Sequence, residues 1–350
     1  MAAEAARADP LAAYDFELPP ERIAQHPLPE RDLARLLVLP RGEGPLQHAS
    51  VRDLGALLRP GDLLVVNESR VIPARLRGRK ASGGAAEALL LGPPDAVGRC
   101  RALLRTRGRL RVGLLLCFRA GECSVEARVS SVQRDGEVEL VFAAGPSPLE
   151  LGEAPLPPYI RRKQPDPADL TRYQTVYARV PGSVAAPTAG LHFTLDLLEG
   201  LARAGVEWTR VVLHVGSGTF RPLRAEQLTA GTLHPERYEL SPRCAEAVAR
   251  TRLRGGRVIA VGTTAARVLE ARASSNAEVA PGRGTTDLFL RPGSSFRVID
   301  GLLTNFHLPR SSLLLLVAGF AGRDRVMGAY SEALARGYRF YSYGDAMLVL

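Results

Sequence analysis

The sequence predicts an α/β protein: a layered α/β domain with a mainly parallel sheet, plus an inserted small β-barrel domain. Two different sequence patterns support this prediction. After residue 155, apolar strand-like runs alternate with helix-like segments, as does the run 62–66 after a Pro-Gly turn. Between 74 and 153, short runs rich in Val, Leu and Arg alternate with glycines, which is typical of a small antiparallel barrel or sandwich. A chain of 350 residues also exceeds one ordinary core.

The elements of the α/β domain follow from local patterns. Residues 196–204 carry leucines at helical spacing after Thr194, a suitable N-cap, so they are expected to form a helix. Further helices are expected at 241–252, which begins with Ser-Pro, and at 265–272. Buried strands are expected at 62–66, 209–214, 257–261 and 313–320. The last run is too short to span a bilayer, which needs about 20 residues.

The inserted segment shows no convincing helical period. Its strands are expected at 86–91, 110–112, 114–118, 124–133 and 138–142. We assign the barrel domain to residues 74–155. The α/β domain then consists of residues 1–73 and 156–350 and is discontinuous in sequence.

The formal net charge of +10 indicates a polyanionic partner such as nucleic acid. The alternative is a solvated, arginine-coated surface, because 44 of the 46 basic residues are arginines. The four cysteines show neither C-x-x-C spacing nor a dense framework, so a reduced, cytoplasmic compartment is expected. No membrane association is expected.

Familiar signatures are missing from the sequence. It has no Walker A string, no G-x-G-x-x-G that opens a helix and no nucleophile elbow. Its histidines have no partner at metal-binding spacing, so no metal site is expected. An ordinary kinase, dehydrogenase or hydrolase is therefore disfavoured.

Residues 172–220 hold most of the groups suited to chemistry. Small residues precede His192 just before a predicted helix, where free amides suit an anionic group, although a tight turn with a core histidine is the alternative. His214 ends a predicted strand and is followed by Gly216 and Gly218, which would let the backbone approach a ligand or merely bend the chain. A second strand ends in Gly-Thr-Thr, where Thr263 either helps to bind a ligand or caps the next helix.

Three further strings combine aromatic and polar residues. Residues 157–163 place Tyr159 beside three cations, a mixture that suits a nucleic-acid backbone with a stacked base, or a solvated hinge. Residues 305–310 form a polar rim before an apolar run. Residues 338–347 hold Tyr341, Tyr343 and Asp345, so the chain end is expected to be docked rather than frayed.

Taken together, these strings resemble the S-adenosylmethionine:tRNA ribosyltransferase-isomerase family of queuosine biosynthesis. The resemblance extends from about residue 14 to residue 350. Eight strings carry it in order: DLLVVNESRVIPAR (62–75), PLPPYIR (155–161), RYQTVYA (172–178), APTAGLHFT (186–194), LHVGSGTFRP (213–222), VGTT (261–264), TNFHLP (304–309) and YRFYSYGDAM (338–347).

The resemblance implies that the ribosyl group of S-adenosylmethionine is transferred and isomerised onto the 7-aminomethyl-7-deazaguanine at the wobble position of a tRNA anticodon loop. Epoxyqueuosine would form, and adenine and methionine would leave. S-adenosylmethionine is then a consumed co-substrate, so no cofactor is expected. Members of the family have an α/β domain with an inserted barrel, which agrees with the domain classes that the sequence patterns predict. A monomer is our expectation for the assembly.

The reaction needs general acid–base groups, for which histidine and tyrosine are natural choices near neutral pH. The catalytic candidates, without a ranking of acid against base, are Tyr173, Tyr177, His192, His214 and Asp345. The residues expected to bind the donor are Thr188, Gly190, Gly216, Gly218, Thr219, Thr263, Thr264, Asn305 and His307. The residues expected to face tRNA are Asn67, Arg70, Arg75, Arg161 and Arg162.

Two other functions stay open at this point. One is a different S-adenosylmethionine-dependent RNA-modifying enzyme such as a methyltransferase, which the missing strand and glycine-rich-loop fingerprint disfavours. The other is a non-catalytic RNA-binding protein, which the charge alone supports. The histidine-rich strand end favours chemistry over simple binding.

Overall fold

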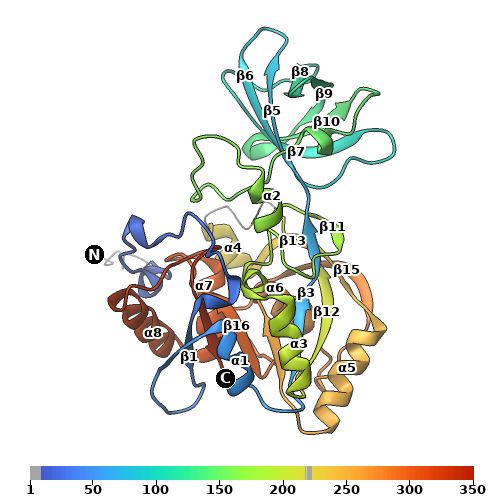
Figure 1. The fold of residues 1–350 in the computed structure, drawn as a ribbon. Helices are drawn as coiled ribbons and strands as arrows, with labels where there is room; N and C mark the ends of the chain where they lie inside the picture. Colours follow the sequence, from blue (N-terminus) through green and yellow to red (C-terminus); the bar gives the residue numbers. More distant parts are fainter. Residues whose placement is uncertain (1–8, 217, 219–222) are drawn as a thin grey trace, which may run out of the picture.

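The structure is a computed structural model that describes residues 9–216, 218 and 223–350. Its α/β domain lies at one end and a closed barrel at the other (Figure 1). Thr219, one of the predicted donor-binding residues, lies outside the described residues. The α/β class and the small barrel are both confirmed.

The α/β domain is built on a nine-stranded sheet within the described residues. The four central strands, in the order β12-β3-β14-β16, run parallel to one another. Across the whole sheet, four of the eight pairs of neighbouring strands are parallel and four are antiparallel. The sheet is therefore mixed, and the prediction of a mainly parallel sheet holds only for its centre. In order across the sheet, the strands are β15 (Gly282–Leu288), β13 (Thr232–Leu240), β12 (Glu207–Leu213), β3 (Leu63–Asn67), β14 (Val258–Val261), β16 (Gly301–Asn305), β17 (Ala346–Val349), β1 (Arg35–Leu39) and β2 (Gln47–Ser50).

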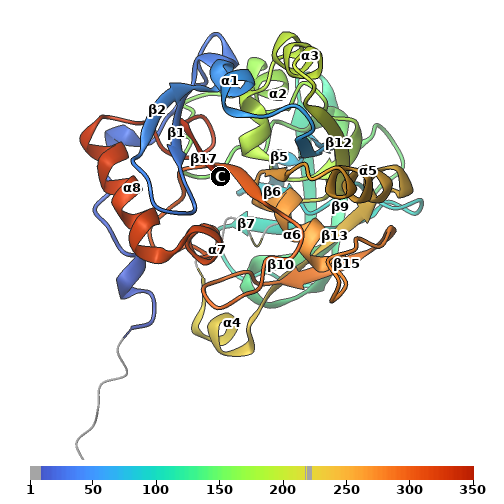
Figure 2. The same cartoon turned by 90° about the horizontal axis from the view of Figure 1, so that it is seen from below.

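Helices cover both faces of this sheet (Figure 2). Successive residues of β3 alternate between two buried clusters, because side chains point to opposite faces of a strand: Leu63 and Val65 pack in one, Leu64 and Val66 in the other. One face packs against α5 (Pro242–Leu253), α6 (Thr263–Ala271), α7 (Ser312–Ala321) and α8 (Arg323–Ala335). The other face packs against α1 (Leu54–Leu57) and α3 (Leu195–Arg203). The short helices α2 (Ala168–Arg172) and α4 (Ala225–Ala230) lie on the side of the domain nearer the barrel (Figure 1).

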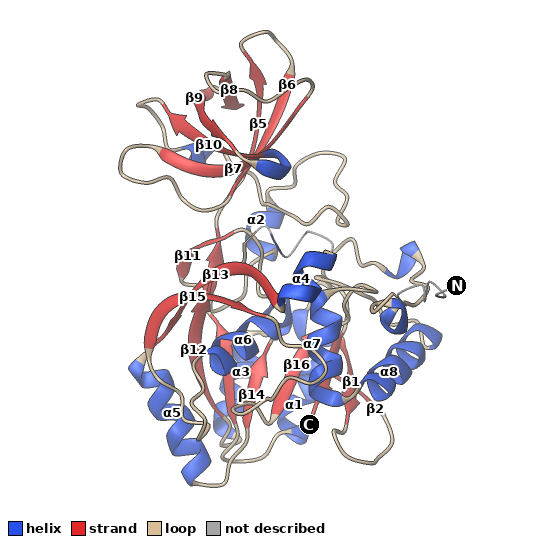
Figure 3. Cartoon of the chain, turned by 180° about the vertical axis from the view of Figure 1, so that it is seen from behind, coloured by secondary structure: helices blue, strands red, loops and turns tan. Residues whose placement is uncertain are grey.

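The barrel consists of six antiparallel strands, which close in the order β10-β7-β6-β5-β8-β9. Buried apolar residues alternate with exposed or half-buried ones along β7 and β9, as a closed sheet with a filled interior requires. Figure 3 shows the barrel almost without helix, in contrast to the domain below it. The strands are β5 (Arg75–Lys80), β6 (Ala85–Leu90), β7 (Arg99–Thr106), β8 (Leu115–Ala120), β9 (Cys123–Val132) and β10 (Glu137–Phe142).

The two chain segments that join the barrel to the α/β domain touch each other. Arg75 and Glu153 exchange backbone hydrogen bonds of 3.2 and 2.9 Å. A Cβ at Gly152 would lie 1.7 Å from the carbonyl oxygen of Pro73, so only glycine fits there. On the α/β side, β4 (Ser69–Val71) pairs with β11 (Val180–Ser183). The domain boundaries after residues 73 and 155 stay a prediction.

Two predicted strands are wrong. Residues 313–320 lie in α7, whose N-cap hydroxyl, that of Ser311, accepts a hydrogen bond from the amide of Leu314. A run that is buried on every side has no period that could separate helix from strand. Residues 110–112 lie between β7 and β8, in a segment flanked by Gly108 and Gly113 at positive φ, and Val112 is exposed.

Candidate functional site

A cavity of about 580 Å³ lies at the edge of the sheet where β12, β14 and β16 end. Ligands of α/β proteins usually bind at such carboxyl ends of parallel strands. Of the predicted donor-binding residues, Thr188, Thr263, Thr264, Asn305 and His307 line it. Among the described lining residues, none is Gly190, Gly216 or Gly218. The other lining residues with polar side chains include Tyr159, Tyr173, Glu236, Arg267, Thr304, Tyr341 and Ser342.

The end of β14 places one helix against this cavity. Gly262 has φ +89° and is the N-cap of α6, so Thr263 is the first helical residue and not the cap. The α6 N-terminus thus faces the cavity through Thr263 and Thr264. Free amides and the helix dipole at such an end favour a negatively charged or electron-rich group.

The side chain of Asn67 links the end of β12 to the start of α6. Its side-chain nitrogen donates to the carbonyl of Leu213 at 3.0 Å and to the hydroxyl of Thr264 at 3.2 Å. Its oxygen accepts from the amides of Ser69 and Leu213. The residue is fully buried. The prediction that Asn67 faces tRNA is therefore wrong, because its amide group is occupied within the protein.

Asn305, at the end of β16, lines the cavity and has an acceptor without a partner among the described residues. Its Nδ2 donates to Nε2 of His192 and to the carbonyl oxygen of Tyr341, both at 3.1 Å. Two acceptors on one side fix the orientation of the amide group, since the oxygen could not take that place. Among the described residues, Oδ1 of Asn305 has no hydrogen-bond partner although it is buried. A ligand donor would satisfy it.

His192 lies behind Asn305 and reaches the cavity only through it. Burial lowers the pKa of His192 to about 4, although the carboxylate of Asp345 acts in the opposite direction. The ring is therefore neutral near pH 7, and a neutral Nε2 that accepts from Asn305 carries its proton on Nδ1. The sequence suggested His192 as an acid–base candidate. In the structure, His192 instead orients the side-chain amide of Asn305.

A tyrosine cluster forms the cavity wall nearest the barrel. Tyr341 has φ +71°, and its ring lies 4.2 Å from that of Tyr159. The hydroxyl of Tyr159 contacts that of Ser342 at 2.7 Å, whereas the buried Tyr341 hydroxyl has no partner among the described residues. Burial raises the pKa of Tyr159 to about 12, and it also raises the pKa values of Tyr173 and Tyr341. These tyrosines are thus protonated donors near neutral pH.

Sequence reasoning missed a buried ion pair on the cavity wall. Glu236, from β13, pairs with Arg267, from α6, and both side chains are buried. The Glu236 carboxylate also accepts the amide of Gly216 at 2.8 Å. Arg267 was within reach of prediction, because it lies one helical turn after Thr263 and so shares its face. Nothing in the sequence around Glu236 marks it.

The other predicted donor-binding residues have mixed surroundings. His307 lines the cavity; its Nε2 contacts the Thr304 hydroxyl at 2.8 Å, and burial lowers its pKa to about 3. Gly190 lies in the 3₁₀ helix Thr188–His192, where a Cβ would lie 2.1 Å from the Tyr177 hydroxyl. Gly218 packs in the same way against the ring of His234. These two glycines serve close packing.

Of the five catalytic candidates, the structure brings only Tyr173 to the cavity wall. Tyr177 packs against Phe193 in the core below α3. His214 packs against Gly182, whose Cβ would lie 2.9 Å from the ring, and among the described residues no group bonds its Nδ1. Among the described lining residues, the other four candidates are absent.

Asp345 is occupied elsewhere. Its carboxylate accepts from the Arg35 guanidinium at 2.9 Å and from the backbone amides of Arg35 and Arg339 at 3.1 and 2.8 Å. The residue is buried and joins β1 to the segment before β17. This arrangement gives Asp345 a structural role.

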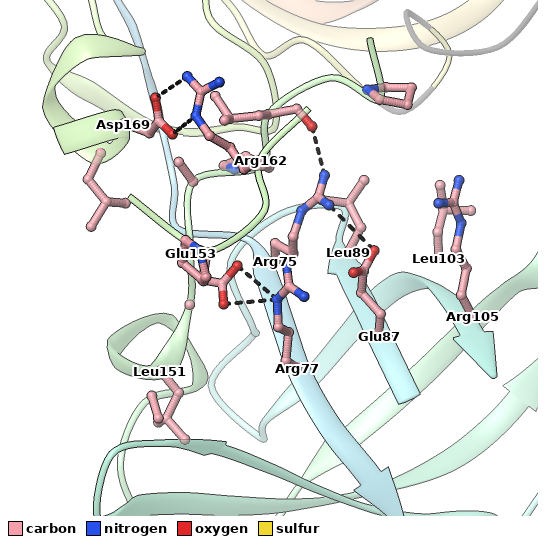
Figure 4. A pocket seen from close by; sticks show the side chains of 18 of the residues that line it. Arg75, Arg77, Glu87, Leu89, Leu103, Arg105, Leu151, Glu153, Arg162 and Asp169 are labelled. Atoms are coloured by element: carbon pink, nitrogen blue, oxygen red, sulfur yellow. Dashed lines mark hydrogen bonds and ion pairs between the residues drawn. The ribbon is translucent and has the colours of Figure 1, made fainter. Parts of the chain in front are cut away.

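A second cavity, of about 810 Å³, lies between the barrel wall and the segment 150–170 (Figure 4). Arg75 lines it but donates to the carbonyl of Leu156 and lies 3.6 Å from Glu87. Arg162 lines it too, and Asp169 binds its guanidinium through two oxygens at 2.8 and 3.0 Å. Both predicted tRNA contacts are therefore partly or wholly committed to internal partners.

Arg70 and Arg161, the other predicted tRNA contacts, are exposed. Among the described residues no carboxylate forms an ion pair with either. Pro158 lines both cavities, so they adjoin at the Tyr159 segment. The predicted absence of a metal site stays a prediction, although no three potential ligands cluster among the described residues. In the described part of the chain, no helix is long and apolar enough to cross a membrane.

The family model described as "Queuosine biosynthesis protein" matches residues 11–349. The chain belongs to this family. Similar members are the S-adenosylmethionine:tRNA ribosyltransferase-isomerases of Anaeromyxobacter dehalogenans strain 2CP-C, 53% identical over 97% of this chain and 99% of that protein, and of Moorella thermoacetica, 49% identical over 96% and 98%. A solved structure, the S-adenosylmethionine tRNA ribosyltransferase of Thermotoga maritima, is 38% identical, covers 97% of this chain and 100% of its own, and has a TM-score of 0.56.

Proposed function

We propose that this member of the queuosine biosynthesis family is an S-adenosylmethionine:tRNA ribosyltransferase-isomerase. It transfers and isomerises the ribosyl group of S-adenosylmethionine onto the 7-aminomethyl-7-deazaguanine at the wobble position of tRNA. The observation that carries the proposal is the cavity at the strand ends, where the buried Oδ1 of Asn305 and the hydroxyl of Tyr341 lack partners among the described residues. Relatives with this name match the chain over nearly its full length.

The cavity suits S-adenosylmethionine in size and chemistry. Its volume of about 580 Å³ lies in the range of small-molecule sites. The α6 N-terminus and the hydroxyls of Thr263 and Thr264 suit the donor's carboxylate. Asn305 offers an acceptor to an N–H or O–H group of the donor. S-adenosylmethionine is consumed, so the proposal requires no further cofactor.

The adjoining second cavity gives the RNA an approach to the donor. An anticodon loop is single-stranded, so its wobble base can be splayed out at lower cost than a base in a duplex. The base would enter past Pro158, which both cavities share. Arg70 and Arg161 are exposed and suit contacts with its phosphates.

The protein's own groups indicate how the chemistry is divided. The departing adenine needs a proton or a hydrogen bond, and Tyr159 and Tyr173 are protonated near neutral pH; burial raises their pKa, which suits them to donate a hydrogen bond rather than to release a proton. Tyr173 is the one original catalytic candidate on the wall, so we assign it a direct contact with the donor. His192 positions Asn305. We further propose that the enzyme acts as a monomer in the cytoplasm.

Product analysis tests this proposal. The protein is incubated with labelled S-adenosylmethionine and a tRNA that carries the deazaguanine precursor, and a tRNA with unmodified guanine is the matched control. Release of adenine and methionine with the precursor tRNA alone is the expected result. S-adenosylhomocysteine would instead identify a methyltransferase. RNA binding without any product would identify a binding protein.

A further inference from the structure

The barrel carries a group of largely exposed cations, of which only Arg105 lines one of the two cavities described above. Every second residue from Arg105 to Arg111 is an arginine, and the last three of these four line one surface depression. Arg105, the first of the four, lies in β7, and the other three lie in the segment between β7 and β8. With two neighbours at the end of β5, they form what we call the barrel track: Arg79, Lys80, Arg105, Arg107, Arg109 and Arg111.

Within the described residues, the barrel track has no paired carboxylate. Among the described residues, no carboxylate forms an ion pair with any of its six cations, whereas Arg77 and Arg101 on the same wall pair with Glu153 and Glu137. All five arginines of the track are exposed. Unpaired, clustered cations are the electrostatic footprint of a polyanion-binding surface.

The far end of the track is hollowed. A surface depression of about 750 Å³ is lined by Lys80 and by Arg107, Arg109 and Arg111, together with the exposed apolar side chains of Val112 and Val132. Lys80 is held in place by its bond to the carbonyl of Arg107 at 2.7 Å. Such a surface offers charge to phosphates and apolar contact to sugars.

The track starts at the second cavity and leads away from it. Arg75 and Arg105 line that cavity, and Lys80 lines the depression. Along β5, the five steps from Arg75 to Lys80 span about 17 Å at about 3.3 Å each. Figure 1 shows the β5–β6 turn at the end of the barrel that points away from the α/β domain. RNA whose loop lies at the cavities can therefore continue along the barrel.

We infer that the barrel track binds the phosphate backbone of the anticodon stem while the loop nucleotide lies at the cavities. This inference rests on the proposed function, because that function supplies an RNA with a stem attached to the reacting loop. The track would add affinity for the whole tRNA and take no part in the chemistry, since it lies outside the cavity that would hold the donor.

A triple variant tests the inference. Arg107→Ala, Arg109→Ala and Arg111→Ala are combined, and Kd and adenine release are measured with whole precursor tRNA and with an anticodon-loop oligonucleotide that lacks the stem. With whole tRNA we expect Kd and KM to rise roughly tenfold or more, and the slope of log K against log salt to become shallower by about 2 to 3, because about three phosphate contacts are lost. We expect kcat, and every constant with the loop oligonucleotide, to stay unchanged.

The matched control removes the same charge elsewhere. Arg254→Ala, Arg283→Ala and Arg323→Ala are combined, three exposed arginines of the α/β domain. Wild-type tRNA binding in the barrel variant, an equal loss in the control, or an equal loss with the loop oligonucleotide would each overturn the inference. Unchanged turnover of the oligonucleotide shows that the barrel variant is folded. If the wild type releases no adenine from either RNA, the proposed function fails, while the tRNA affinities still decide the role of the track.

Discussion

The barrel track and the paired arginines of the α/β domain use the same side chain in opposite ways. On the α/β surface, Arg250 pairs with Glu207 at 2.7 Å and Arg283 with Glu239 at 3.0 Å, whereas the track on the barrel has no paired carboxylate among the described residues. Inside the α/β domain, Arg267 is buried against Glu236 beside the cavity. The same side chain therefore forms internal ion pairs at these α/β positions and is left available for a partner along the track. Charge counted over the whole sequence hides this difference.

The largest expected effect concerns the buried pair. Arg267→Met leaves the Glu236 carboxylate buried without its partner, which should lower the free energy of unfolding by about 3 to 5 kcal/mol. Chemical denaturation followed by the fluorescence of Trp208, the single tryptophan, measures this in the α/β domain. A loss below about 1 kcal/mol would mean that the pair is no more important than a surface ion pair.

The next largest effect concerns His192 and tests whether it positions Asn305 or takes part in catalysis. His192→Ala removes the acceptor that orients Asn305 and should lower kcat/KM for S-adenosylmethionine roughly 10- to 100-fold, the equivalent of about 1 to 3 kcal/mol for an unsatisfied buried group. His192→Gln keeps an acceptor and should recover much of this loss. If the glutamine variant is as inactive as the alanine variant, His192 acts as an acid or base itself.

Acid should weaken the α/β domain more than the barrel. Burial lowers the pKa of His192 to about 4 and of His307 to about 3, from an ordinary 6.5. The unfolded chain therefore binds more protons between about pH 6.5 and 4, so stability is complete above that window and falls as the pH is lowered through it, by about 1 kcal/mol per pH unit for each ring.

This pH dependence can be measured and localised. The residues of the barrel strands include no histidine, so hydrogen exchange should show a smaller loss there. The double variant His192→Gln/His307→Gln should flatten the pH dependence of unfolding followed by Trp208. An unchanged slope in that variant would contradict the assignment of the two rings.

The smallest effect is expected on the barrel wall. Arg101 pairs with Glu137 at the surface, and Arg101→Ala should change the free energy of unfolding by less than about 1 kcal/mol, because solvent screens such pairs. Thermal unfolding of this variant beside Arg267→Met gives the comparison directly. A loss as large as that of Arg267→Met would remove the distinction between the two domains.

Much of the fold could be predicted because it rests on local patterns. The N-cap at Thr194 and the leucines behind it define α3, and the alternation along β9 and β10 defines barrel strands. The run 313–320 could not be assigned in the same way, since burial on all sides removes the period that separates a helix from a strand. The direction of the outer sheet strands likewise depends on distant pairing.

The sequence by itself determined the domain classes, the family resemblance and the strand ends at which the cavity lies. Thr263, Thr264 and Asn305 are at the cavity because each follows or ends a strand of one parallel set. Only the tertiary structure decided that Asp345 and Tyr177 serve the core, that His192 supports Asn305, and that Glu236 meets Arg267. Hydrogen-bond partners and burial arise from residues far apart in the chain, and residue type alone does not specify them.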